Sequence, residues 1–449
     1  MKSNYLLIVF LMLSTLSFSQ SFDIGGTVKE KNSGLPIPGV NIQVINSTKS
    51  AATDFDGKFT LKGISSGSVV VFTFIGYKTL EDSKVLDEVV VIGYGSQKKK
   101  EVTGAVSTVD SKTLEILKPV KIEQALQGTV SGVNVTSQSG SPGASLDIRI
   151  RGIATNGDAK PLTIIDGYIG ELGLLNPNDV ETITVLKDAQ AAIYGSAAAN
   201  GVILVTTKMG KKNSKGKIAY NTYTGFQETS RTLPTLNATE YALLLNESYA
   251  NSGNPIPYAN VSGLGKGTNW QDKTLSKSVP IISHDLTFSG GSDKITYSVS
   301  GSHLDQEGIV GKSKSGFLRN TARVALGADV TDKLKLKTNI IYTYFDRKTL
   351  PENSNASVLL NAVNAPSNLS PYDSSGNFTV FPGGSLGNEM INPLAQIANS
   401  YNDYNFKQIN GNFGLDYKFT PAFVLSSSIG FKTANSESRS FSPMLDYGS

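Results

Sequence analysis

The chain of 449 residues is longer than the ~150 residues of a typical domain, and its 17% of charged residues beside 44 glycines, 18 tyrosines and 19 phenylalanines favours several β-rich domains. The net charge of +4 is small and is not gathered in one patch, which argues against a nucleic-acid partner. The chain has no cysteine and two histidines, so disulfides and thiolate metal sites are excluded, and we expect neither a metal site nor a cofactor.

The start of the chain has the pattern of a cleavable secretory signal. Lys2 precedes an apolar stretch over 5–13, and small residues follow it. We expect cleavage between Ser19 and Gln20, so that residues 1–19 are a signal peptide and the mature chain is exported. An uncleaved anchor is the alternative, but the apolar run falls short of the ~20 residues that a spanning helix needs.

Residues 20–82 are expected to form a small β-sandwich, because short alternating or apolar runs are separated there by Gly, Pro, Asn and Asp. Asp54, Asp56 and Gly57 predict a tight turn; a calcium loop is the alternative, but the later ligands of an EF-hand are missing. The stretch resembles the carboxypeptidase regulatory-like domain in the motifs GVNI (39–42), TDFDGKF (53–59) and IGY (75–77). The acidic and β-branched segment that begins at Asp87 follows these motifs closely, so the last strand of this domain is expected to be short or absent.

The segment 83–100 contains a β-branched run that we interpret as a strand without a sheet of its own. The run over 89–92 favours an extended backbone, while acidic residues before it and glycines after it keep it from extending a neighbouring core. Such a segment suits pairing with the sheet edge of a partner; the alternative is a strand of an adjacent domain. The predicted contact residues are Asp87, Glu88, Val89, Val90, Val91, Ile92, Gly93, Tyr94 and Gly95. Lys98 to Lys100 are interpreted as a solvated linker.

Residues 101–212 mix short strands and helices. The stretch KIEQALQG (121–128) predicts a helix that ends at a glycine, and an alanine-rich stretch over 187–195 predicts another. LDIRIRG, PLTIIDG and GVILVTT predict strands, and the period of two in the first places its isoleucines towards the core and its arginines outward. These motifs resemble the plug domain of SusC/RagA-type TonB-linked outer-membrane proteins.

The resemblance extends to the β-branched segment, which is similar to the TonB box of this family. It implies that residues 87–95 recruit TonB, which is driven by its inner-membrane motor proteins. A pull on this segment would then remodel the mixed α/β plug and open a path for bound cargo.

Residues 213–449 alternate apolar and polar side chains in the manner of a membrane barrel, with an apolar face towards lipid. The expected strands lie near 217–227, 283–290, 294–303, 317–329, 333–345, 406–419 and 422–433. Short turns are expected after the second, fourth and sixth strands and long connections after the first, third and fifth, so that the chain enters the barrel from the periplasmic side. A soluble sandwich is the alternative, but it gives no reason for such sorting of loop lengths.

The expected fold is therefore mainly β, with a small β-sandwich, a mixed α/β plug and the first seven or eight strands of an antiparallel transmembrane barrel. Because transporters with a plugged lumen use 22 strands, the chain is expected to be a fragment that lacks most of the barrel. We expect no enzyme, since no G-x-S-x-G, H-E-x-x-H or complete P-loop is present. A surface adhesin is a further alternative, but it has no use for a TonB box and a plug.

The resemblance implies a TonB-dependent receptor in the outer membrane that imports an oligosaccharide or a peptide. It also implies a SusD-type surface lipoprotein as partner, lipid around the barrel, and a periplasmic location for the regulatory-like domain and the TonB box. The sequence alone names no substrate-binding residue.

Overall fold

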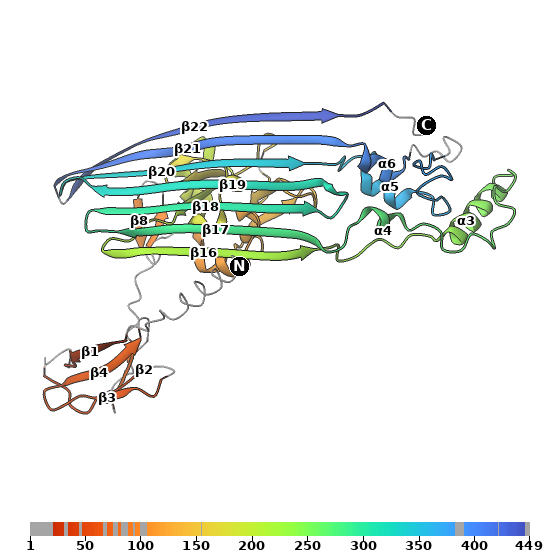
Figure 1. The fold of residues 1–449 in the computed structure, drawn as a ribbon. Helices are drawn as coiled ribbons and strands as arrows, with labels where there is room; N and C mark the ends of the chain where they lie inside the picture. The colour runs from red at the N-terminus through yellow and green to blue at the C-terminus, as the bar shows by residue number, and fades with distance from the viewer. Residues whose placement is uncertain are drawn as a thin grey trace, which may run out of the picture. The chain divides into compact units, whose positions relative to one another are not determined.

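The computed structural model describes residues 21–30, 35–44, 47–65, 70–74, 80–81, 89–92, 95–98, 106–153, 155–381, 390–420 and 422–444. The expected signal peptide, with its cleavage site at Ser19 and Gln20, lies outside these residues. Asp87, Glu88, Gly93 and Tyr94 lie outside them too. The described chain falls into two compact units, one that ends before Val89 and one that begins there (Figure 1).

The first unit is a small β-sandwich, as predicted. Its strands are β1 (Ser21–Thr27), β2 (Asn41–Val44), β3 (Ser50–Ala52), β4 (Lys58–Ser65), β5 (Val70–Thr73) and β6 (Leu80–Glu81). β1 pairs with β4, and the other four form a sheet in the order β3-β2-β5-β6. Ile42 and Leu61, one from each sheet, are buried in the shared core. The last strand, β6, is short, as expected from the sequence.

The predicted turn before β4 is confirmed. Asp54 Oδ1 accepts hydrogen bonds from the backbone N–H groups of Asp56 and Lys58, at 2.9 and 2.8 Å. Gly57 has φ +71°, and a Cβ there would lie 2.5 Å from the carbonyl oxygen of Val28. Only glycine therefore fits this position, and the acidic side chain serves the turn itself.

The β-branched segment begins the second unit, and it is half of a hairpin. β7 (Val89–Ile92) pairs antiparallel with β8 (Gly95–Lys98). The expectation of a strand without a sheet is therefore wrong, and Lys98, expected in a linker, belongs to β8. The backbone N–H and C=O groups of an extended run need hydrogen-bond partners, and the following segment supplies them when it folds back alongside the run. Glycine favours the tight turn that this requires, and the sequence has glycine at 93 and 95.

The plug is a mixed α/β domain built on one five-stranded sheet. Its strands are β9 (Val106–Asp110), β10 (Val133–Ser137), β11 (Leu146–Ile150), β12 (Leu162–Ile165), β13 (Tyr168–Ile169), β14 (Val180–Leu186) and β15 (Val202–Thr207). The sheet order is β13-β12-β15-β14-β9, with β12 and β15 parallel, while β10 and β11 form a separate pair. α2 (Ser111–Leu117) begins at Asp110, whose side chain accepts a hydrogen bond from the backbone N–H of Thr113.

The two helices expected in the plug are 3₁₀ segments instead of α-helices. The first is Ile122–Leu126, and the alanine-rich stretch carries the short 3₁₀ turns Asp188–Gln190, Ala192–Tyr194 and Ser196–Ala198. Two further 3₁₀ turns are Leu172–Leu174 and Pro177–Asp179. The alanine-rich stretch does not form one helix because its backbone leaves the helical region at Asp188 (φ +54°) and again at Gly195 (φ +72°). Ile148 and Ile150 lie in the core of the plug, as the period of two predicted.

The rest of the second unit is a seven-stranded antiparallel sheet, the wall, with the plug against one face (Figure 1). Its strands are β16 (Ser214–Gln227), β17 (Val279–Gly291), β18 (Ile295–Gly308), β19 (Lys312–Asp329), β20 (Leu334–Lys348), β21 (Tyr401–Thr420) and β22 (Phe423–Phe441). The two long connections carry α3 (Ala238–Asn251) and α4 (Trp270–Thr274), and α5 (Val358–Asn364) and α6 (Pro393–Ala398). Each strand pairs with the next along the chain, as expected for the beginning of a barrel.

The connection after the third wall strand is short, contrary to expectation. β18 and β19 continue to pair as far as Gly308 and Lys312, so only residues 309–311 separate them. The hydrogen-bonded pairing of β18 with β19 extends beyond residue 303, where the alternating apolar stretch used for the prediction ends. Long connections therefore follow only the first and the fifth strands of the wall.

The two faces of the wall differ as predicted. On β20, Asn339 and Thr343 are buried against the plug side, while Leu336 and Tyr342 are exposed on the other side. An apolar outer face and a polar inner face are the arrangement of membrane barrels. None of the helices in the described ranges is long and apolar enough to cross a membrane.

Candidate functional site

The plug is held against the wall by buried polar contacts. Arg323 of β19 is 1% exposed, and its Nε donates to Asn339 Oδ1 at 2.9 Å. Its Nη2 donates to the carbonyl oxygen of Lys208, at 2.8 Å, and to Thr207 Oγ1. Asn339 Nδ2 donates in turn to Asp166 Oδ2 in the plug. One wall arginine thus joins two wall strands to the end of β15.

A second group of contacts lies at the 3₁₀ turn before β14. Ser300 Oγ donates to Asp179 Oδ1 at 2.5 Å, and Asn176 Nδ2 donates to Asp285 Oδ1 at 2.7 Å. Burial raises the pKa of Asp179, while the Arg323 guanidinium and the Ser300 hydroxyl oppose this shift. These groups are rehydrated when plug and wall separate, so this interface can open at less cost than an apolar core of equal size.

A plug loop over 138–145 makes a close steric contact with the wall. Gly143 has φ +66°, and a Cβ there would lie 2.3 Å from Cδ2 of Phe317 on β19, a side chain that is 4% exposed. Lys121 Nζ donates to the carbonyl oxygen of Gly143 at 3.0 Å and lies 5.9 Å from the centre of the Phe317 ring. The loop is therefore fixed at one place by steric fit and by a charged donor.

Replacing Gly143 by alanine is expected to loosen the plug. Gly128 is the matched control, because it has φ +73° and nothing within 4 Å of a Cβ, so Gly128→Ala carries the backbone strain without the clash. Overpacking typically costs ~1–3 kcal/mol, which corresponds to protease cleavage of the plug about 5- to 150-fold faster in Gly143→Ala than in Gly128→Ala. Equal cleavage rates in the two variants would contradict this contact.

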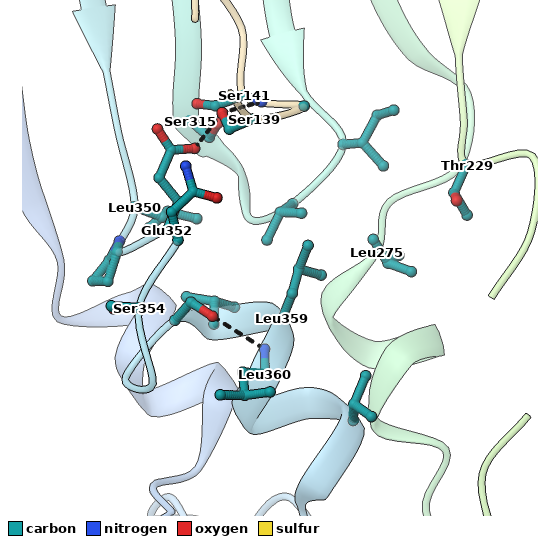
Figure 2. Close-up of a pocket in the computed structure, with 18 of the residues that line it drawn as sticks. Ser139, Ser141, Thr229, Leu275, Ser315, Leu350, Glu352, Ser354, Leu359 and Leu360 are labelled. Atoms are coloured by element: carbon teal, nitrogen blue, oxygen red, sulfur yellow. Dashed lines mark hydrogen bonds between the residues drawn. The ribbon is translucent and has the colours of Figure 1, made fainter. Parts of the chain in front are cut away.

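A cavity of about 720 Å³ lies at the end of the wall that carries the long connections (Figure 2). The plug loop residues Ser139 to Pro142 form one side of it. The aliphatic side chains that line it are Leu233, Leu275, Ile309, Val310, Leu350, Val358, Leu359, Leu360 and Val363. No aromatic side chain lines it among the described residues. Figure 2 shows Leu275, Leu350, Leu359 and Leu360 around the opening, with Ser139 and Glu352 at one edge.

The polar side chains of this cavity are mostly bonded to the protein itself. Glu352 accepts hydrogen bonds from Ser139 Oγ at 2.7 Å and from Arg347 Nη2 at 3.3 Å. Asn353 Nδ2 donates to the carbonyl oxygen of Gln138 at 2.9 Å, and Ser357 Oγ accepts from the N–H of Leu360 in the first turn of α5. The surface left for an occupant is mainly aliphatic.

A second cavity, of about 810 Å³, lies between the plug and the wall. Phe345, Tyr404 and Phe406 line it, and the Phe345 ring centre lies 5.0 Å from that of Phe406 and 5.7 Å from that of Tyr404. Charged residues of both signs also line it: Lys121, Lys160 and Arg347, and Glu123, Asp158 and Glu171. The plug loop lines both cavities, the first through Pro142 and the second through Gly143.

The predicted contact residues are not part of either cavity. Val89 to Ile92 form β7 and Gly95 begins β8, while the other predicted contact residues lie outside the described part of the chain. Within the described ranges, no three His, Cys, Asp or Glu side chains converge as metal ligands would. Sequence reasoning missed the cavity residues, because they come from segments far apart in the chain and share only their aliphatic character.

The chain resembles known proteins along most of its length. Residues 98–202 match the TonB-dependent Receptor Plug Domain and residues 24–107 the CarboxypepD_reg-like domain. A TonB-dependent receptor of Formosa agariphila is 34% identical over 94% of this chain and 44% of its own length. The TonB-dependent receptor SusC of Bacteroides thetaiotaomicron is 34% identical over 96% of this chain and 47% of its own length.

The fold resembles that of a solved importer. The structure of the RagAB peptide importer in the open-open state matches with a TM-score of 0.68 and 26% identity, over 79% of this chain and 43% of that one. The chain thus spans less than half the length of the relatives it matches.

Proposed function

The chain belongs to the SusC/RagA-type TonB-dependent receptors, and we propose that it serves to import a nutrient across the outer membrane with energy delivered through TonB. The observation that carries this proposal is that the plug loop lines the aliphatic cavity. An occupant that touches Ser139 and Pro142 touches the domain that TonB is proposed to move. Cargo binding and plug movement are therefore coupled through one loop.

A peptide is the cargo that the cavity favours. Every ring of an oligosaccharide carries hydroxyl groups, and burying one without a partner costs ~1–3 kcal/mol. The aliphatic lining offers few such partners, because Glu352, Asn353 and Ser357 are already bonded. It suits the side chains of apolar amino acids. An oligosaccharide is the second candidate, because the second cavity combines aromatic rings with charged groups.

The proposed location and orientation in the outer membrane follow from the family and from the two faces of the wall. The apolar outer face is proposed to meet outer-membrane lipid, with the short turns at 292–294, 330–333 and 421–422 on the periplasmic side. The regulatory-like domain and the TonB box are proposed to lie on that side as well. A SusD-type lipoprotein is the proposed partner at the end with the long connections. The proposed role is transport without catalysis.

Uptake by cells with and without the gene tests the cargo. Cells are given a mixture of peptides and, separately, a mixture of oligosaccharides, and loss of each compound from the medium is measured by mass spectrometry. We expect the cells that lack the gene to leave a set of apolar peptides in the medium. Loss of oligosaccharide uptake alone would contradict the peptide assignment, and unchanged uptake of both classes would contradict import.

The cavity itself is tested by Leu359→Gln. Leu359 lies in the cavity on α5 and is 46% exposed, so the change should leave folding intact. Loss of an apolar contact of ~1–3 kcal/mol predicts peptide uptake about 10- to 200-fold weaker at low concentration. Leu244→Gln is the control, because Leu244 is an exposed leucine of α3 outside the cavity. Equal uptake by the two variants would remove this cavity from the cargo path.

A further inference from the structure

The two histidines of the chain, His284 on β17 and His303 on β18, lie directly opposite each other in the wall (Figure 1). Their ring centres are 6.4 Å apart, and the ring planes differ by 20°. Ser283 and Asp285 on either side of His284 are buried towards the plug, so both imidazoles lie on the outer face of the wall. The expectation of no metal site rested on the small number of histidines, whereas the register of the strands places the two side by side.

The two rings lie where the apolar band of the outer face ends. Their row across the sheet consists of Thr222, His284, His303, Asn320, Tyr344, Lys407 and Asn435. Among the described residues of the wall, the next four rows towards the short turns contain no charged side chain on this face. At ~6.7 Å per row and a strand tilt of ~40°, four rows cover ~20 Å of the ~25 Å apolar band of a membrane barrel. The row on the other side contains Asp305, Asp346 and Glu437, so water reaches the imidazoles.

Hydrogen bonds hold both rings through Nδ1. His303 Nδ1 lies 2.8 Å from the acceptor Asn320 Oδ1, so this nitrogen carries a proton. The Thr222 hydroxyl donates its own proton to the carbonyl oxygen of Ser283 at 2.9 Å, so its oxygen accepts from His284 Nδ1, 3.0 Å away. These partners assign the proton to Nδ1 in both neutral rings, which leaves a lone pair on each Nε2. Neither Nε2 has a hydrogen-bond partner within the described part of the chain.

We propose that His284 and His303 bind one divalent transition-metal ion through their Nε2 atoms. Imidazole suits Cu²⁺, Zn²⁺ and Ni²⁺, and a metal-bound histidine commonly donates its other ring N–H to a neighbouring oxygen, as both rings do here. Opposite residues of a sheet have Cβ atoms ~4.5–5.5 Å apart, so small ring rotations bring both nitrogens to the ~2.0 Å of a metal bond. Water completes the coordination. The site involves neither the cargo nor TonB, so it goes beyond the proposed import.

Tyr220 of β16 supports the ring of His284 on the side away from His303. Its ring lies 6.2 Å from the imidazole, with the planes 8° apart, and its hydroxyl oxygen lies 2.8 Å from His284 Nδ1. The imidazole is therefore held by stacking as well as by hydrogen bonds. A ligand whose orientation is fixed before binding loses less conformational entropy when the ion arrives.

Electron paramagnetic resonance with Cu²⁺ alone tests the site, because coordinated imidazole nitrogens split the copper signal. Cu²⁺ has the highest affinity among the divalent first-row ions for a given set of ligands. It is added in substoichiometric amounts to the receptor as the cell makes it, purified in detergent, and to the variants His284→Gln and His303→Gln. We expect the splitting of two imidazole nitrogens in the unmodified receptor and of at most one in each variant. Affinity should fall at least about tenfold in both, since losing a ligand costs no less than losing its hydrogen-bond partner.

Asn320→Leu separates this site from general polarity of the row. It keeps both ligands but removes the acceptor that holds His303 Nδ1, so we expect two coordinated nitrogens and Cu²⁺ affinity about 10- to 100-fold weaker. Asn435→Gln, in the same row on β22, is the matched control and should bind as the unmodified receptor does. Each variant is used only after its mobility is shown to change on heating. Unchanged splitting and affinity in both histidine variants would overturn the proposal, as would an equal loss in Asn435→Gln.

Discussion

A polypeptide of residues 1–449 is expected not to give a heat-modifiable, protease-resistant barrel in detergent. In the described chain the wall is an open sheet, since β16 pairs only with β17 and β22 only with β21. Each unpaired backbone group on these two edges costs several kcal/mol in hydrocarbon. Closing seven strands on themselves would not remove the problem, because a barrel of about eight strands is filled by its own side chains and has no room for a plug.

Gel mobility with and without heating measures this directly. The polypeptide is refolded into detergent beside SusC of Bacteroides thetaiotaomicron, which serves as the positive control for the procedure. We expect the relative to change mobility on heating and the 449-residue polypeptide to migrate at one position. A monomeric band from this polypeptide that shifts on heating and resists protease would contradict the prediction.

The wall could be predicted from the sequence because its two faces differ in polarity. The outer face, which we propose meets lipid, is apolar, and the face towards the plug is polar, so residues such as Leu336 and Asn339 alternate in a visible pattern. The prediction failed beyond Leu304, where the ladder between β18 and β19 continues without that pattern as far as Gly308. Pairing there depends on the neighbouring strand, which a single strand's sequence does not reveal.

The hairpin and the cavity could not be predicted for different physical reasons. β8, with the sequence GSQK, has little intrinsic preference for a strand and is extended because β7 lies beside it. The cavity is formed by loops that converge from the plug and from three connections of the wall. The helix predicted in the alanine-rich stretch is absent because residues with positive φ interrupt it, as at Asp188, where the sequence has no glycine to mark the break.

Uptake should cease when the segment that we propose recruits TonB loses backbone hydrogen-bond donors. The double change Val89→Pro with Val91→Pro removes two N–H groups from this segment, so strand pairing with TonB cannot be completed. The control is Val89→Thr with Val91→Thr, which keeps both donors and the β-branched shape at the same positions. Equal amounts of the three proteins in the outer membrane must be verified first.

The central claim, that this receptor imports cargo with energy from TonB, is tested most directly by one uptake measurement. The initial rate of peptide uptake is compared in cells with the unmodified receptor, with the proline pair, with the threonine pair, and with the unmodified receptor in the absence of TonB. The account predicts that the proline pair falls to the rate of the cells without TonB, while the threonine pair keeps most of the unmodified rate. Uptake that persists at the unmodified rate in the proline pair, or in the cells without TonB, would contradict it.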